Sequence, residues 1–101
     1  MSMYRNAKIL ASAEGKHCTM RSAMCNGDPN TVVWCHSNFS EHGKGVGLKA
    51  HDIFGFFGCS GCHRWFDIDS RVGDTAAGRR AMFHRAHAES LLILVQEGVL
   101  Q

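Results

Sequence analysis

The longest regular pattern in the chain is an amphipathic repeat near its C-terminal end. Apolar side chains recur there three or four positions apart, at Met82, Phe83, Ala86, Leu91, Leu94 and Val95. This spacing is typical of a helix that buries one face. Asp74 or Thr75 can cap its start, and Gly98 can end it. The sequence therefore predicts a long final helix.

Two shorter segments before residue 21 also have a regular pattern. Residues 3–13 fit a short helix that Gly15 ends, and residues 16–20 fit a short strand that carries Cys18. The turn-forming residues 25–29, Cys-Asn-Gly-Asp-Pro, then predict a tight loop.

The middle of the chain predicts two strands separated by a long connection. Residues 31–36 are β-branched and aromatic and residues 52–57 are apolar and aromatic, which favours a strand in each. The glycine-rich segment 37–50 between them predicts a polar, basic loop, and a helix is expected from about Cys59 to about Ser70. Helices and strands mixed in this order indicate an α+β fold, in one domain spanning residues 1–101.

The cysteines indicate a metal site. Cys59 and Cys62 have the C-x2-C spacing that lets two thiolates bind one ion, and Cys18 and Cys25 form a second pair upstream. We expect these four thiolates to bind one structural Zn²⁺, although the six-residue gap in the upstream pair exceeds the usual two to four. The alternative, that Cys18 and Cys25 are simply buried, stays open. The fifth cysteine, Cys35, lies in an apolar run and is expected to be a buried core residue.

Composition narrows the classes of protein to which the chain can belong. A hydrophobic content of 45% excludes disorder as the default, and five cysteines are an odd number for a disulfide framework. There is no βαβ pattern to support a thioredoxin-like redox pair. No apolar run is long enough for a signal peptide or a membrane span, so we expect a soluble, cytoplasmic protein. A net charge of +2 does not by itself identify a nucleic-acid partner.

Histidines near the cysteines suggest a second site. Neighbouring side chains on a helix diverge by about 100°, so His63 should point away from the ion that binds Cys62. His63 and Asp67 are four residues apart, which places both on one helix face, where they can bind a catalytic cation. His36, at the end of a predicted strand, is the candidate general base, and Asn38 could orient it or the substrate phosphate.

The basic loop would complete this second site. Lys44 and Lys49 in the loop, together with Arg64 on the helix, are expected to contact the substrate. Asp52 is a weaker candidate for the metal ligands. A purely structural alternative is that Asp67 and His63 only stiffen the helix through a contact between neighbouring turns.

These motifs resemble two related groups of proteins. The layout of His36 followed by Cys59-x2-Cys62-His63 resembles the HNH (ββα-metal) endonucleases. The segments Cys25-Asn-Gly-x-Pro-x-Thr-x-Val-x-x-His36 and Cys59-Ser-x-Cys-His-x3-Asp67 are more closely similar to the YbcO-like family of small lambdoid-phage and prophage proteins. The resemblance runs from about residue 5 to residue 99. In two places the chain departs from the HNH pattern, because Cys35 precedes the histidine and Phe54 stands near the usual middle asparagine.

The resemblance implies a zinc-stabilised HNH-like fold and nuclease activity in phage DNA metabolism, in the bacterial host cell. His36 would then be the general base and His63 a ligand of a catalytic Mg²⁺, Mn²⁺ or Zn²⁺. The expected function is hydrolysis of DNA phosphodiester bonds. The rival hypothesis is a non-catalytic zinc module that binds nucleic acid or protein.

Overall fold

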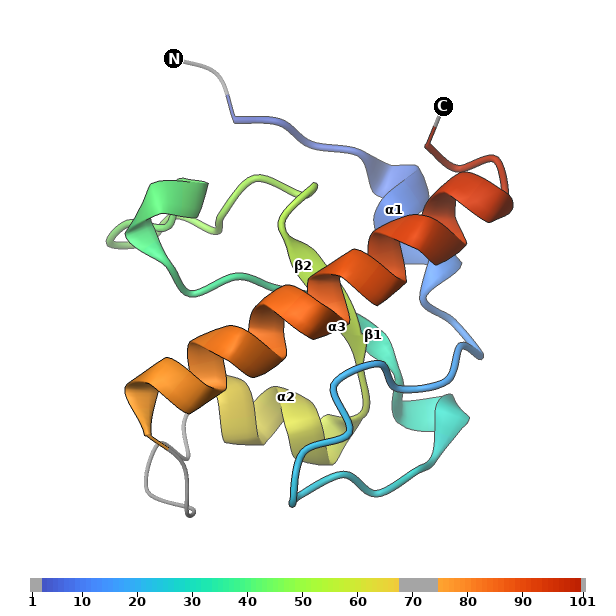
Figure 1. Cartoon of the computed structure of the whole chain (residues 1–101). Coiled ribbons are helices and arrows are strands. Elements are labelled where there is room, and N and C mark those ends of the chain that lie inside the picture. Colours follow the sequence, from blue (N-terminus) through green and yellow to red (C-terminus); the bar gives the residue numbers. More distant parts are fainter. Residues whose placement is uncertain (1–2, 68–74, 101) are drawn as a thin grey trace.

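A two-stranded antiparallel sheet lies at the centre of the fold (Figure 1). The computed structural model describes residues 3–67 and 75–100. In it, β1 (Val33–His36) pairs with β2 (Gly55–Gly58). This register places His36 opposite Gly55. Both predicted strands are present but start later than expected. A 3-10 turn, η1 (Pro29–Thr31), precedes β1, and a turn closed by the Phe54 N–H and the carbonyl of His51 (3.0 Å) precedes β2.

Among the described residues, three α-helices surround the sheet. The prediction of a long final helix is confirmed: α3 (Ala76–Gln96) packs on β2 and crosses the sheet (Figure 1). Its N-cap is Thr75, whose hydroxyl accepts from the Gly78 N–H at 2.9 Å, and the alternative cap Asp74 lies outside the described residues. After its C-terminal end, Gly98 adopts φ +76°, in the left-handed region that glycine enters without strain.

The helix α2 (Ser60–Asp67) follows β2 directly, as predicted, and the expected continuation to Ser70 lies outside the described residues. The first helix, α1 (Ala7–Ser12), is shorter than the predicted span 3–13. Its N-cap is Asn6, whose side chain accepts from the Lys8 N–H at 3.1 Å. Asn6 itself is extended (φ −145°, ψ 98°), and its N–H donates to Asp52 at 2.7 Å.

The predicted strand at residues 16–20 is wrong. Thr19 donates its backbone N–H to the carbonyl of Phe57 at 2.8 Å, so the segment touches β2 at this point. The chain turns immediately afterwards, because Arg21 adopts φ +51°, which is incompatible with a strand. The segment 37–50 is a long connection, as predicted, and it contains a single 3-10 turn, η2 (Ser40–His42).

The core is aromatic where α2, α3 and the sheet meet. The rings of Phe56, Phe66 and Phe83 are packed against one another, with centroids 5.3 to 5.9 Å apart. Aromatic pairs of this kind gain stability beyond the burial of their area. The core thereby fixes α2 relative to β1 and β2. Among the described residues, no helix has the length and hydropathy that crossing a membrane would require.

Candidate metal centre and neighbouring groove

The four cysteines predicted to bind one ion lie together. The sulfur atoms of Cys18, Cys25, Cys59 and Cys62 are all within 4.8 Å of one another. The Sγ atoms of Cys25 and Cys59 are 3.7 Å apart, and a tetrahedral zinc site with bonds of about 2.3 Å has sulfurs about 3.8 Å apart. Four converging thiols of this spacing fit a metal ion such as zinc. Cys35 is fully buried in the core instead, as predicted, and burial raises the pKa of its thiol well above the usual value.

Backbone amides support the thiolates. Cys62 Sγ accepts from the Ser22 N–H at 3.3 Å, and Cys59 Sγ accepts from the N–H groups of Asn26 and Cys62, both at 3.4 Å. The hydrogen bond from Cys62 lowers the pKa of Cys18 to about 4, and the same bond raises the pKa of Cys62. Since metal ligands must be deprotonated, the backbone N–H donors help to keep the sulfurs of Cys59 and Cys62 anionic, whereas the bond to Cys18 favours the protonated form of Cys62.

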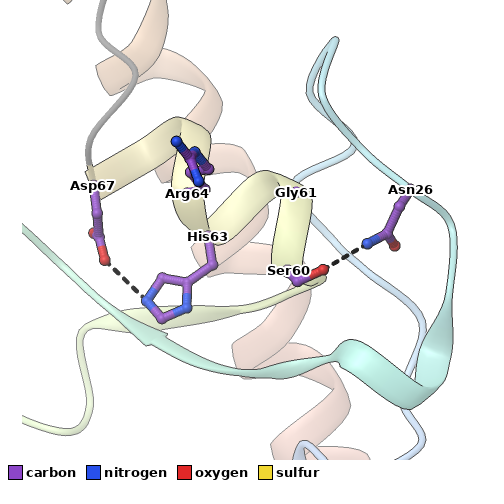
Figure 2. A pocket seen from close by; sticks show the side chains of 6 residues that line it. All are labelled: Asn26, Ser60, Gly61, His63, Arg64 and Asp67. Atoms are coloured by element: carbon purple, nitrogen blue, oxygen red, sulfur yellow. Dashed lines mark hydrogen bonds and ion pairs between the residues drawn. The ribbon is translucent and has the colours of Figure 1, made fainter.

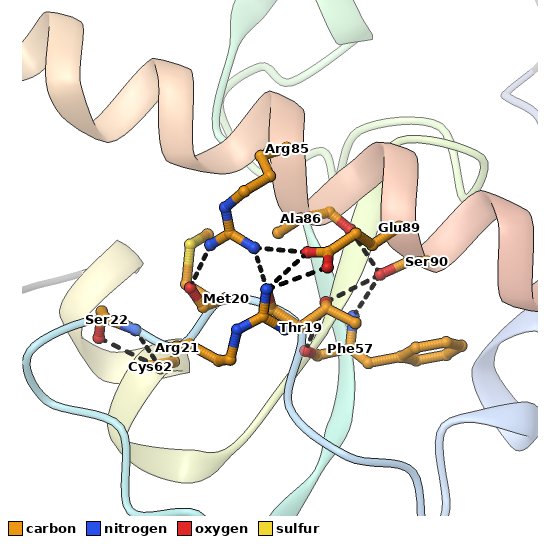
Figure 3. Close-up of polar contacts among 10 residues, drawn as sticks. All are labelled: Thr19, Met20, Arg21, Ser22, Phe57, Cys62, Arg85, Ala86, Glu89 and Ser90. Carbon is orange, nitrogen blue, oxygen red and sulfur yellow. Dashed lines mark hydrogen bonds and ion pairs between the residues drawn. The ribbon is translucent and has the colours of Figure 1, made fainter.

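Polar contacts from α3 hold the loop that follows Cys18 (Figure 3). Glu89 accepts two hydrogen bonds from the guanidinium of Arg21, both at 3.0 Å. Arg85 donates to the carbonyl oxygen of Thr19 (2.9 Å) and to the next carbonyl along. The long C-terminal helix thus helps to position the first cysteine relative to the other three.

A second site is a groove of about 270 Å³ beside β1 and α2. Its lining includes six of the seven residues predicted for catalysis, cation binding and substrate contact, namely His36, Asn38, Lys44, Lys49, His63 and Asp67. Leu10, Trp34 and Ser37 complete the lining. The groove therefore brings together a histidine from the sheet, a histidine and a carboxylate from the helix, and two lysines from the long loop.

His36 is held by a buried carboxylate. Its Nε2 lies 2.7 Å from Oδ1 of Asp52, whose side chain is only 4% exposed. Burial alone would raise the pKa of Asp52, but hydrogen bonds from His36 and from the Asn6 N–H lower it, so the group is a carboxylate. A carboxylate at Nε2 makes this nitrogen the donor, which leaves Nδ1 as the atom that can accept a proton.

His63 and Asp67 point toward one another from successive turns of α2 (Figure 2). His63 Nε2 is 2.9 Å from Asp67 Oδ2, and Asn38 donates to Asp67 Oδ1 at 3.0 Å. This contact raises the pKa of His63. Burial opposes ionisation of Asp67, yet the bonds from His63 and Asn38 lower its pKa, and the positive charge of Lys44 acts in the same direction. To bind a cation, both side chains would exchange their mutual contact for the ion.

Arg64 lies apart from the two lysines. It lines a neighbouring, more open hollow of about 560 Å³ along α2, together with Asn26, Ser60 and Gly61 (Figure 2). His63 and Asp67 line both hollows, so they stand between Arg64 and the groove of His36.

Two relationships were missed by the sequence reasoning. Asp52, considered only as a metal ligand, is the hydrogen-bond partner of His36, and Asn38 donates to Asp67 where we expected it to orient His36 or a phosphate. The signal for Asp52 was present, since an acidic residue at the start of an apolar stretch is rarely left unpaired when buried. Its partner could not be chosen until the pairing of β1 with β2 was known.

Comparison with known proteins gives the family. The family model described as "Putative nuclease YbcO" matches residues 7–99. Curated proteins of that name from Escherichia coli K12 and from Enterobacteria phage 82 are each 28% identical over 96 residues, covering 94% of this chain and 98% of their own.

A solved structure is also similar. It is described as a "putative bacteriophage protein" from Escherichia coli K-12 MG1655, and it matches with a TM-score of 0.68 and 27% identity over 88% of this chain and 98% of its own. The family match spans the cysteine cluster and the groove alike. The chain therefore belongs to the family described as "Putative nuclease YbcO".

Proposed function

We propose that the protein is an HNH-type (ββα-metal) endonuclease that hydrolyses phosphodiester bonds in DNA, in the cytoplasm of a bacterial host. The observation that carries this proposal is the groove in which His36, backed by Asp52, lies with His63 and Asp67. The order of elements, β1, a long connection, β2 and then α2, is consistent with the ββα arrangement.

His36 would act as the general base. Asp52 fixes the ring and accepts from Nε2, so that Nδ1 can take a proton from the attacking water. The same carboxylate stabilises the imidazolium that results, as in other His–Asp pairs. Lys44 and Lys49 would bind the phosphates next to the cleaved bond, since both line the groove and both are cationic.

His63 and Asp67 would bind a divalent cation such as Mg²⁺, Mn²⁺ or Zn²⁺, with Asn38 orienting the carboxylate. When bound, the cation supplies positive charge that stabilises the phosphate and the leaving oxygen. The four cysteines would bind a structural Zn²⁺ that ties the segment between α1 and η1 to the start of α2.

One observation favours a second candidate function. His63 and Asp67 already contact each other, with Nε2 and Oδ2 2.9 Å apart, as expected if the pair only stiffens α2. The protein would then be a zinc-stabilised module that binds DNA or protein without cleaving it.

The test is cleavage of supercoiled plasmid, linear duplex and single-stranded DNA by zinc-loaded protein, with Mg²⁺, Mn²⁺ or Zn²⁺ added. We expect His36→Ala to lower the rate by about 10² to 10⁴-fold while bound zinc and circular dichroism stay unchanged. His84→Ala is the matched control, because His84 is an exposed histidine on α3 that does not line the groove. Undiminished cleavage by His36→Ala would refute the role of His36, and no cleavage of any DNA by the wild-type protein would favour the binding module.

A further inference from the structure

The long connection between the strands ends in a tight, ordered turn. Gly45 and Leu48 exchange both backbone hydrogen bonds, with N···O distances of 3.3 and 3.0 Å, so only Val46 and Gly47 form the tip. Gly47 adopts φ +71°, which a type II turn requires at its second central position. The sequence of this tip therefore specifies a defined turn in a segment that we expected to be a simple loop.

The base of the turn is fixed to the rest of the protein. The His51 N–H donates to the carbonyl of His42 at 3.0 Å and so closes the loop. Arg5 donates to the carbonyl of Lys49 at 3.0 Å and also to that of Ala50. Because both ends are held, the tip is presented in one place with little ordering entropy left to lose on binding.

The tip is apolar and lies beside the groove. Val46 is fully exposed (106%) and Leu48 is 50% exposed. Lys44 and Lys49, which flank these residues in the sequence, line the groove of His36. A single exposed valine is common on protein surfaces and needs no explanation by itself. This valine, however, lies on a turn between two glycines and has a lysine on each side, which together suit a partner of one kind. Cations beside an apolar tip suit a polyanion that has an apolar interior.

We propose that Val46 enters the minor groove of double-stranded DNA and wedges into a base step while Lys44 and Lys49 bind the flanking phosphates. A valine side chain is narrow enough for this groove, which is about 6 Å wide, and the paired backbone of Gly45 and Leu48 would stay at its edge. Apolar wedges of this kind partly unstack a step and kink the duplex, and pyrimidine–purine steps such as TA yield most easily. The preferred substrate is therefore duplex DNA with a deformable step near the cleaved bond. This inference rests on the proposed function, because it names the substrate of the same groove.

The test measures binding separately from cleavage. His36→Ala protein without added divalent cation is titrated with two short duplexes, one carrying 2-aminopurine at a central TA step and one in which the probe lies in a stiff A-tract. We expect tighter binding to the TA duplex and a rise in its fluorescence as the step unstacks. Adding Val46→Ser should remove the rise and weaken binding to the TA duplex by on the order of tenfold.

Two controls separate the wedge from the charges. Val95→Ser removes a valine that is 54% exposed on α3, outside the groove, and should leave both signals unchanged. Lys44→Gln should weaken binding to both duplexes alike and reduce the slope of log affinity against log salt by about 0.9.

The outcomes distinguish this proposal from the nuclease proposal. If the wild-type protein cleaves DNA but Val46→Ser binds both duplexes as before, the wedge is overturned and the nuclease stands. If Val46 controls DNA binding but no metal supports cleavage, the wedge stands and the nuclease falls. If sedimentation shows that the protein self-associates and Val46→Ser removes this association while DNA binding stays unchanged, the tip is a protein contact and the wedge is overturned.

Discussion

Glu89 lies on α3, yet we predict that Glu89→Gln weakens zinc binding at the cysteine cluster. The physical reason is the backbone of Arg21, which adopts φ +51°. A left-handed conformation costs a residue with a Cβ about 1–2 kcal/mol. The next residue, Ser22, points its N–H at Cys62 Sγ because of this turn. The pair of hydrogen bonds from Arg21 to Glu89 offsets part of the cost (Figure 3).

The expected effect is modest because the pair is exposed. The side chains of Arg21 and Glu89 are 54% and 40% exposed, and exposed ion pairs contribute about 0–1 kcal/mol. If the folded conformation of the loop is destabilised by about 1 kcal/mol, the affinity for zinc should be about fivefold weaker. Direct loss of a thiolate, as in Cys59→Ser, should instead lower stability sharply, because binding and folding are coupled.

The assay is competition for zinc against a chromophoric chelator. Glu41→Gln is the matched control, since Glu41 also pairs with an arginine, Arg80, but away from the cysteines. A second comparison tests the strain itself. Arg21→Gly can adopt φ +51° freely, so it should bind zinc more tightly than Arg21→Ala. If Glu89→Gln matches Glu41→Gln in affinity, or Arg21→Gly is no better than Arg21→Ala, the reasoning about this loop is wrong.

Three further predictions follow from other parts of the structure. Gly61→Ala should lose zinc and stability, because a Cβ there would lie 2.0 Å from a backbone carbonyl of the loop before Cys25. The control is Gly45→Ala, which should unfold at the same urea concentration as the wild type, because the nearest atom to its Cβ would be 3.8 Å away. Asp52→Asn should slow cleavage on the order of 10²-fold and add little to His36→Ala in the double variant, since the two residues act as one unit; additive losses in rate would contradict this. Burial lowers the pKa of His42 and His87, so their contribution to stability is present above the unfolded pKa of about 6.5 and is lost as pH falls. Urea unfolding at pH 7.5 and 5.5 should show a smaller difference for His87→Gln than for the wild type, and an equal difference would contradict this.

Local patterns predicted the elements whose signals lie within the element itself. The spacing of apolar residues in α3 and the C-x2-C motif before α2 depend on few distant contacts. Residues 16–20 have a strand-like composition, but their conformation depends on distant contacts: Thr19 bonds to Phe57, and Arg21 turns toward Glu89. No property of residues 16–20 alone reveals these partners.

In the candidate site, too, the sequence predicted what depends on residue type but not what depends on distant contacts. The four cysteines could be grouped from the sequence because one ion needs four similar ligands, and the structure brings their sulfurs together. The partner of His36 could not be chosen in this way, since Asp52 and Asp67 are both plausible carboxylates for a histidine. The register that places His36 opposite Gly55 decides between them, because it leaves Asp52 three residues before the start of β2 and beside the ring.

The helix α2 connects the two candidate metal sites through adjacent residues. Cys62 is buried and faces the cysteine cluster, whereas His63 lines the groove, as the 100° step between neighbouring helical residues requires. Any ion that binds the four sulfurs fixes the first turn of α2, and one turn later the same helix presents Asp67. The direction of His63 and Asp67 thus depends on a cluster to which neither side chain contributes a ligand. Removal of zinc should therefore disorder the groove before any residue of the groove is changed, and substitutions in the groove should leave the zinc in place.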